Sequence, residues 1–385
     1  MNETNEFSSK LLEKDLHHDA VSDYLKLMKN ETSVVIWGCA ATGQTVYDFL
    51  SKFGVAGCVK YFADNNRQKW GTRFNGLPVL SAEEVVNLTR ENPETRIIIA
   101  AIHLVDIRNQ LLSLGIEDKS IDINGFFLAK NYWTFRDKTA YQIIQSRIED
   151  YAKVYALLAD ERSKAVYLSI LNAKISLDSR YLAGIASPSG EKYFEKKLIK
   201  LSEYEVFCDC GSFNGDTLDT FIALSGGKYQ KYIAIEADKD IHEELMRRIA
   251  SKGYANIQTH NLACWKEKTI LNFHPALSSG RIAEEGSISV NADTLDNILK
   301  EENVTFIKMD IEGAEEMALR GAGGVIGRNK PILAVCLYHS LEDFYRLPLL
   351  MKDLNPEYRL FVRHYKDMVD YETVCYAIPE DRLIP

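Results

Sequence analysis

The sequence predicts an α/β protein with two parallel sheets, and three observations support this. Two series of short apolar segments alternate with helical segments, one in residues 1–130 and the other in residues 201–385. The chain has 385 residues, more than one hydrophobic core usually includes, so two domains are expected. Only a short polar stretch separates the last two strand-like segments, which is typical of an antiparallel hairpin.

The first series predicts a small Rossmann-like domain in residues 1–130. After a polar helical segment, SVVIWG (33–38) is an apolar strand, and an amphipathic helix follows over 43–54. CVKYFADNN (58–66) and RIIIAAI (96–102) are the next strands, with a helical segment between them. Strands that alternate with helices in this way form a parallel sheet with helices on its faces.

Residues 131–200 are expected to form a helical connector. Apolar side chains recur there at steps of three and four, which places them on one face of a helix. We interpret this stripe as packing in a core or an interface. Its members are Tyr141, Ile144, Ile148, Tyr151, Tyr155 and Leu158.

The second series consists of five strand-like segments and a closing hairpin. The five segments are mostly separated by helical stretches: EVFCDCG (205–211), KYIAIEAD (231–238), ANIQTHNLAC (255–264), VTFIKMD (304–310) and PILAVCLYH (331–339). YRLFVRHY and ETVCYAIP follow as the hairpin. Five parallel strands that end in such a hairpin are the layout of class I methyltransferases, so residues 201–385 are expected to form a domain of that kind.

Composition and charge exclude several classes of protein. The net charge of −9, with no cluster of Lys and Arg, argues against a nucleic-acid partner. No segment approaches the ~18 to 20 apolar residues of a membrane span, and the N-terminus lacks the pattern of a secretory signal, so we expect a cytoplasmic protein. The seven cysteines are scattered and lack zinc-finger spacing, so reduced thiols are expected.

The two cysteines of FCDCGSFNGDT (207–217) invite a metal or disulfide interpretation, which the spacing disfavours. In a strand, Cys208 and Cys210 face the same side and lie about 7 Å apart, too far for a disulfide. No second pair of ligands for zinc lies nearby in the sequence. We therefore interpret both cysteines as buried packing residues.

The other residues of this stretch predict a cofactor-binding turn. Gly211 and Gly215 bracket a turn where a ligand can contact the backbone, and the amides of a helix that opens near Thr217 attract an anionic group. Asp209, on the strand face opposite the cysteines, is placed to face an ammonium group. Glu236 ends the next strand, where a carboxylate can accept both hydroxyls of a ribose. Together these features favour an adenosine cofactor such as S-adenosylmethionine, with a plain tight turn as the alternative.

KMDIEGAEEMAL (308–319) places charged groups at the end of the fourth strand. Ligands of an open parallel sheet lie beyond the carboxyl ends of the strands, so Asp310 and Glu312 are expected near the reactive end of the cofactor, with Lys308 tuning the carboxylates. A solvated helix N-cap is the alternative for one of the two carboxylates. His339, at the end of the fifth strand, is a candidate general base.

These residues resemble the FkbM-type S-adenosylmethionine-dependent methyltransferases. The resemblance rests on DCGSFNGDT, IEAD, DTLDNIL, FIKMDIEGAEEMALRGA, KPILAVCLYH, FVRHY and ETVCYAIP, which occur in that order. It implies O-methylation of a hydroxyl on a sugar, a glycan precursor or a secondary metabolite. It also implies that Asp209, Gly211, Gly215 and Glu236 hold the cofactor. Whether a divalent metal takes part is left open, and Asp310 and Glu312 are interpreted as substrate-side or metal-capable residues.

The first domain resembles a different family. WGCAATGQTVYDFL and YFADNNRQKWGTRFNGLPVLS are similar to the Rossmann-like domain at the front of sugar O- and N-acyltransferases, which implies binding of a nucleotide-sugar. Gly38 and Gly43 then match the glycine turn and Asp64 the acid after the second strand. The usual GxG is broken by Cys39, so a packing role is the alternative for this domain. A non-catalytic nucleotide-sugar or partner-binding module on a methyltransferase shell is the alternative for the whole chain, and the sequence makes no prediction of the oligomeric state.

Overall fold

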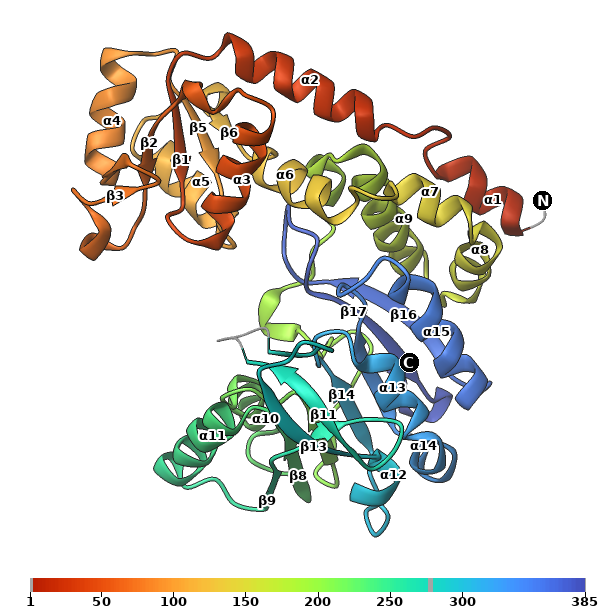
Figure 1. Ribbon diagram of the computed structural model, residues 1–385. Coiled ribbons are helices and arrows are strands. Elements are labelled where there is room, and N and C mark those ends of the chain that lie inside the picture. The colour runs from red at the N-terminus through yellow and green to blue at the C-terminus, as the bar shows by residue number, and fades with distance from the viewer. Residues whose placement is uncertain (1–2, 276–279, 385) are drawn as a thin grey trace. The chain divides into compact units, whose positions relative to one another are not determined.

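The computed structural model describes residues 3–275 and 280–384, which form two compact units (Figure 1). Unit 1 comprises Met1–Ile148, Tyr167–Ala186 and Lys366–Asp370, and unit 2 comprises Glu149–Val166, Ser187–Tyr365 and Tyr371–Pro385. Residues 1, 2 and 385, at the ends of the first and last predicted domains, lie outside the described residues. The residues of the expected connector, 131–200, are shared between the two units.

Unit 1 is built on a six-stranded sheet of order β3-β4-β2-β1-β5-β6. All neighbours are parallel except β3 and β4. The strands are β1 (Val34–Trp37), β2 (Val59–Ala63), β3 (Arg73–Phe74), β4 (Leu77–Leu80), β5 (Arg96–Ile99) and β6 (Ile121–Asp122). The three strands predicted from apolar runs are therefore confirmed, each shortened by two to four residues.

Helices cover both faces of this sheet because successive side chains of its buried strands point to opposite sides. Val34 and Ile36 of β1 pack in one core with α2, α3 and α6, whereas Val35 and Trp37 pack in the other with α4 and α5. The helices of this part are α1 (Glu3–Lys10), α2 (His17–Asn30), α3 (Ala41–Lys52), α4 (Ala82–Glu91), α5 (Leu104–Ser113), α6 (Gly125–Thr134) and α7 (Ala140–Gln145).

Unit 2 is built on a seven-stranded sheet of order β16-β17-β15-β14-β7-β8-β9. β15, β14, β7, β8 and β9 are parallel, and β17 is antiparallel to both of its neighbours, as predicted. The strands are β7 (Val206–Cys210), β8 (Lys231–Ile235), β9 (Ile257–His260), β14 (Phe306–Met309), β15 (Ile332–Cys336), β16 (Arg359–His364) and β17 (Thr373–Ile378).

A second, four-stranded sheet lies in unit 2 and was not predicted. Its order is β10-β13-β11-β12, with β10 (Ala263–Cys264), β11 (Thr269–His274), β12 (Arg281–Ile282) and β13 (Ile288–Asp293). The predicted strand 255–264 thus divides into β9 and β10, which belong to different sheets. The helices of unit 2 are α8 (Ile148–Leu157), α10 (Asp216–Ser225), α11 (Lys239–Lys252), α12 (Leu295–Ile298), α13 (Glu315–Arg320), α14 (Gly323–Asn329) and α15 (Asp343–Leu354).

The helical region differs from the prediction in two respects. The apolar stripe from Tyr141 to Leu158 is not one helix, because α7 ends at Gln145 and α8 begins at Ile148. Regular helix also stops with α9 (Glu161–Ser176), and only two short 3-10 turns follow before β7. Over the described ranges, none of the helices has the length and apolar character that crossing a bilayer requires.

Candidate functional site

A cavity of about 500 Å³ opens in unit 2 at the carboxyl ends of β7, β8 and β14. Open parallel sheets bind their ligands at this edge, and the volume lies within the usual range for pockets that bind small molecules and cofactors. Several predicted site residues line it: Gly211, Thr217, Glu236, Lys308, Asp310 and Glu312. Asp209, Gly215 and His339 are not among the lining residues.

The turn after β7 requires its two glycines for steric reasons. Gly211 has φ +77°, and a Cβ there would lie 2.0 Å from the carbonyl oxygen of Asp310. Gly215 caps the N-terminus of α10 with φ +91°, and a Cβ there would lie 2.9 Å from Leu245. Both backbones are in the left-handed region that glycine favours. Gly211 also borders the cavity, so its lack of a side chain serves both strand packing and ligand access.

Asp209 is enclosed rather than open to the cavity. Its carboxylate pairs with Lys308 Nζ at 2.8 Å and accepts a hydrogen bond from the Tyr232 hydroxyl. Its side chain is fully buried. Burial raises the pKa of Asp209 to about 6 although Lys308 opposes the shift, so the carboxyl is ionised at neutral pH. The Asp209 carboxylate is therefore not open to the ammonium group of a cofactor as predicted, because the Lys308 ammonium group already occupies that position.

Glu236 occupies the position predicted for it at the end of β8. One carboxylate oxygen accepts from the backbone N–H of Phe213 at 2.9 Å and the other from that of Asp238 at 2.9 Å. These two bonds fix the carboxylate at the cavity wall, and each oxygen keeps a lone pair for a further donor. The pKa of Glu236 is raised, chiefly by burial.

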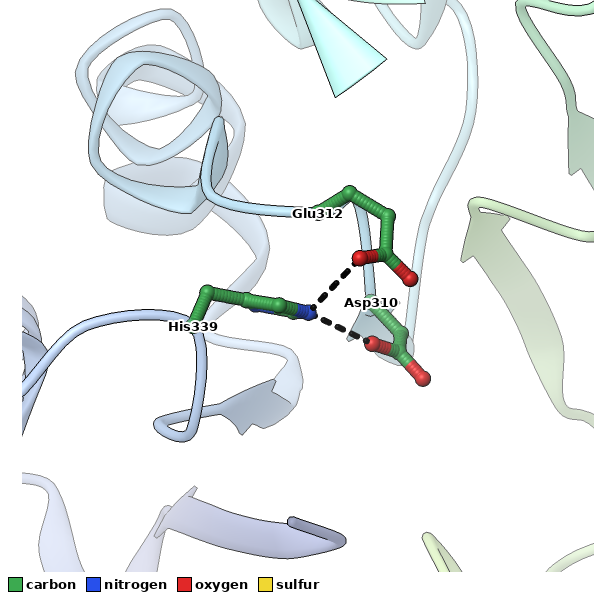
Figure 2. Close-up of side chains that lie close together, drawn as sticks. All are labelled: Asp310, Glu312 and His339. Atoms are coloured by element: carbon green, nitrogen blue, oxygen red, sulfur yellow. Dashed lines mark ion pairs between the residues drawn. The ribbon is translucent and has the colours of Figure 1, made fainter. Parts of the chain in front are cut away.

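Asp310, Glu312 and His339 converge at the end of β14 and β15 (Figure 2). His339 Nε2 lies 3.6 Å from Asp310 Oδ1 and 3.6 Å from Glu312 Oε2. The three atoms lie within 4.8 Å of one another. Glu312 is held in the left-handed region, with φ +55°, which is uncommon for a residue with a side chain. The loop after β14 thus presents two carboxylates to one imidazole.

Asp310 is the most strongly held member of this cluster. The hydroxyls of Tyr193 and Tyr338 donate to its two oxygens at 2.6 and 2.7 Å, and Lys192 Nζ lies 3.5 Å away. Burial alone would raise the pKa of Asp310, but Lys192 and Lys308 outweigh it and hold the pKa far below its ordinary range. Asp310 is therefore a permanent anion and a weak base.

His339 does not have the properties expected of a general base. Burial alone would lower the pKa of His339, but Glu315, Asp310 and Glu312 outweigh it and raise the pKa to about 9. Unless a metal ion is bound beside it, the imidazole is protonated at neutral pH, and neither ring nitrogen is then free to accept a proton. By contrast, burial raises the pKa of Glu312, which makes this carboxylate a stronger proton acceptor than Asp310.

Among the polar residues that line the cavity and were not predicted are Lys192, Tyr193, Asp216 and Tyr338. Asp216 follows Gly215 and Tyr338 precedes His339, so their position next to predicted residues was a usable signal. Lys192 and Tyr193 come from the irregular segment before β7, where the sequence carries no pattern that points to a site. Asp216 also places a negative charge at the start of α10, where an anionic ligand group was expected.

Unit 1 has a smaller cavity, of about 360 Å³, beside the turn after β1. Gly38 and Asp64 line it, as the nucleotide-sugar interpretation requires. Asp64 is already engaged, because it accepts from the backbone N–H of Cys39 and pairs with Lys69. A Cβ on Gly43 would lie 1.9 Å from the Gly38 carbonyl oxygen, so close packing of helix on strand accounts for Gly43.

The sheet order of unit 2 and the cavity at its carboxyl edge define a class I methyltransferase fold. Residues 209–366 match the model of the family described as "Methyltransferase FkbM domain". The match covers residues 209–366 alone, so the resemblance to a methyltransferase FkbM domain applies to that part of the chain.

One solved structure agrees with this assignment of the fold. The crystal structure of methyltransferase FkbM from Methylobacillus flagellatus KT superimposes with a TM-score of 0.66 and 22% sequence identity, over 93% of each chain. A partial match, to Aeropyrum pernix fibrillarin in complex with natively bound S-adenosyl-L-methionine, has a TM-score of 0.31 and 13% identity, over 48% of this chain and 71% of that one. No curated protein matches the chain in sequence. The resemblance of residues 1–130 to sugar acyltransferases is untested by these matches and stays a prediction.

Proposed function

We propose that unit 2 binds S-adenosylmethionine in its cavity and transfers the methyl group to a hydroxyl oxygen of a small acceptor. The acceptor class we propose is a sugar, a glycan precursor or a secondary metabolite. The observation that carries the proposal is the Glu236 carboxylate, which two backbone amides fix at the end of β8 within a cofactor-sized cavity. A carboxylate at this point of a doubly wound sheet accepts the hydroxyls of an adenosine ribose.

The reaction forms a bond between the acceptor oxygen and the methyl carbon and breaks the bond between that carbon and the sulfonium sulfur. The hydroxyl loses its proton, and S-adenosylhomocysteine leaves. Orientation of the acceptor behind the methyl group can contribute about 7 to 11 kcal/mol, more than the roughly 3 to 5 kcal/mol that a general base supplies. Positioning is therefore the main task of the residues on the cavity wall.

The proposed roles follow from the charge and surroundings of each group. Asp310 is a permanent anion held by two tyrosines and orients the acceptor hydroxyl. Glu312, whose pKa burial raises, is the proton acceptor. Lys308 holds Asp209 and donates to the Gly211 carbonyl oxygen at 2.6 Å, so it maintains the turn that the cofactor contacts.

Replacing Glu236 tests the cofactor site directly. In Glu236→Gln the amide group faces a backbone N–H and cannot accept two ribose hydroxyls, so affinity for S-adenosylhomocysteine is expected to fall about 10- to 100-fold. Isothermal titration calorimetry of the full chain measures this. Glu243→Gln is the control, because Glu243 lies on the neighbouring helix α11 and pairs loosely with Arg247 at the surface.

Two outcomes would contradict the proposal. Unchanged affinity in Glu236→Gln would remove Glu236 from the cofactor site. A wild-type protein that gains thermal stability from UDP-sugars and not from S-adenosylhomocysteine would instead favour the non-catalytic nucleotide-sugar module. The cavity of unit 1 beside Gly38 and Asp64 is the place we propose for such a nucleotide-sugar.

A further inference from the structure

We propose that Asp310, Glu312 and His339 bind a divalent first-row metal ion at the wall of the cavity in unit 2. The atoms assigned as ligands are Asp310 Oδ1, Glu312 Oε2 and His339 Nε2 (Figure 2). Two of these residues line the cavity, so an ion held by all three would face it.

The imidazole of His339 carries the proposal. Its side chain is only 9% exposed, and Nε2 makes no hydrogen bond within the described part of the chain. A buried polar atom without a partner is costly and rare, so it points to a group that completes it. Figure 2 shows Nε2 directed toward the space between the two carboxylates.

The spacing of the ligand atoms fits an ion between them. Nε2 stands 3.6 Å from each carboxylate oxygen, too far for a hydrogen bond to either. Nitrogen and oxygen ligands lie about 2.0–2.2 Å from zinc, which places ligands of a tetrahedral ion about 3.4 Å apart. If Nε2 served only to pair with these two carboxylates, it would be expected to approach one of them within hydrogen-bond distance.

A fourth residue orients the imidazole as metal sites require. Glu315 Oε1 lies 3.1 Å from His339 Nδ1 and also accepts from the backbone N–H of Ile311 at 2.9 Å. Glu315 is only 1% exposed, so its position is fixed. Histidine ligands usually donate their second ring nitrogen to a carboxylate in this way, which leaves the other nitrogen for the metal.

The ligand set selects the class of ion. Carboxylates suit magnesium, calcium and manganese, whereas an imidazole suits zinc, copper, iron and nickel, so the mixed set favours a first-row ion such as Mn²⁺, Fe²⁺ or Zn²⁺. Three protein ligands leave coordination positions open toward the cavity, as in catalytic sites. If the proposed function holds, such an ion would polarise the acceptor hydroxyl; the binding of the ion itself does not depend on that function.

Metal titration of the full chain tests the proposal. Chelator-treated protein is titrated with Mn²⁺, and free Mn²⁺ is measured by electron paramagnetic resonance, with Zn²⁺ as the competitor. We expect a single tight site that Zn²⁺ displaces. His339→Ala and Glu312→Gln are expected to weaken Mn²⁺ binding by at least about tenfold, the lower limit seen even when residues that only orient a ligand are replaced.

Matched controls separate this site from general acidic binding. His103→Ala removes an exposed histidine that also lies 3.6 Å from a carboxylate, that of Asp106. Glu316→Gln removes a carboxylate of α13 that pairs with Arg320. Both are expected to bind Mn²⁺ like the wild type. Equal binding in His339→Ala, or no tight site in the wild type, would overturn the proposal.

A second titration keeps the two proposals apart. S-adenosylhomocysteine affinity of the same samples, measured by calorimetry, shows whether the cavity is folded and competent. Mn²⁺ binding without S-adenosylhomocysteine binding would support the metal site and contradict the proposed function. S-adenosylhomocysteine binding without Mn²⁺ binding would support the cofactor site of the proposed function and contradict the metal site.

Discussion

Asp209 and Lys308 lie opposite each other in the parallel register of β7 and β14, and both are almost fully buried. The alternation of side chains along one strand predicted that Asp209 faces away from Cys208 and Cys210. It could not predict that Lys308 of a strand nearly 100 positions later in the chain lies opposite. Glu236 and Asp310 were predictable because each follows a strand directly, and Glu312 lies two residues after Asp310, whereas Lys192 and Tyr193 follow no strand.

At the residue scale, Asp209→Asn is expected to destabilise the protein by about 3–5 kcal/mol. The asparagine leaves Lys308 as a buried charge without its carboxylate, and removal of one member of a buried pair has this typical effect. Urea denaturation followed by circular dichroism measures the change.

The double variant Asp209→Asn with Lys308→Met provides the check on this explanation. It removes both charges, so it is expected to recover most of the lost free energy of unfolding. A double variant as unstable as Asp209→Asn would show that the ion pair is not the source of the effect.

At the scale of elements, apolar runs predicted β1, β2 and β5 of the first large sheet and the strands of the second, because a buried parallel strand is apolar on both faces. The small sheet β10-β13-β11-β12 was missed because β10 and β12 have only two residues each and β11 and β13 are partly exposed, with Ile270 of β11 67% exposed. The break between α7 and α8 has neither proline nor glycine to mark it. What the sequence did not reveal are thus elements defined by their tertiary partners.

The turn after β7 gives a prediction at this scale. Gly211→Ala places a Cβ 2.0 Å from the Asp310 carbonyl oxygen, so β7 and β14 have to separate there. The matched control is Gly227→Ala, which has a similar φ of +73° but no atom within 4 Å of the new Cβ. The control is expected to cost about 1–2 kcal/mol from the left-handed backbone alone.

Gly211→Ala is expected to cost a further 1–3 kcal/mol or so, the usual range for overpacking. Urea denaturation of the two variants side by side measures the difference. Equal destabilisation would show that the backbone conformation, and not the approach of β14, requires glycine at this position.

At the scale of the whole molecule, neither unit is one continuous segment of chain. Residues 366–370, between β16 and β17 of unit 2, belong to unit 1. Asp370 in this segment is 3% exposed and pairs with Lys130 at 2.6 Å and Lys174 at 2.8 Å. Burial alone would raise the pKa of Asp370, but the two lysines outweigh it and hold the pKa far below its ordinary range.

This cluster predicts how stability depends on pH. Because the folded pKa of Asp370 is depressed, its contribution is fully present above the ordinary value of about 3.9 and is lost as the pH falls below it. Asp370→Asn is therefore expected to cost about 3–5 kcal/mol at pH 7. The difference from the wild type is expected to narrow as the pH falls from about 4 to 3 and to go on narrowing below that, because the folded pKa lies still lower. Burial lowers the pKa of Lys174, but a lysine titrates far above this range.

Tryptophan fluorescence during urea denaturation measures this effect in unit 1. Three of the four tryptophans, Trp37, Trp70 and Trp133, belong to unit 1, so a Trp265→Phe background removes the signal of unit 2. Asp137→Asn, at an exposed position of unit 1, is the control and is expected to show no such pH dependence. A constant difference between Asp370→Asn and the wild type from pH 7 to pH 3 would contradict the assigned pKa.

The position of Asp370 in the sequence limits how the chain can be divided into fragments for separate expression. A fragment that stops at Ala186 holds the whole six-stranded sheet and contains Lys130 and Lys174, but it lacks the Asp370 carboxylate that pairs with both. Lys174, which is 8% exposed, would then have to become solvated or lose its proton. Expressing unit 1 alone therefore requires more than cutting the chain at one boundary in the sequence. A peptide of residues 366–370, linked to the end of such a fragment, is expected to restore the missing carboxylate.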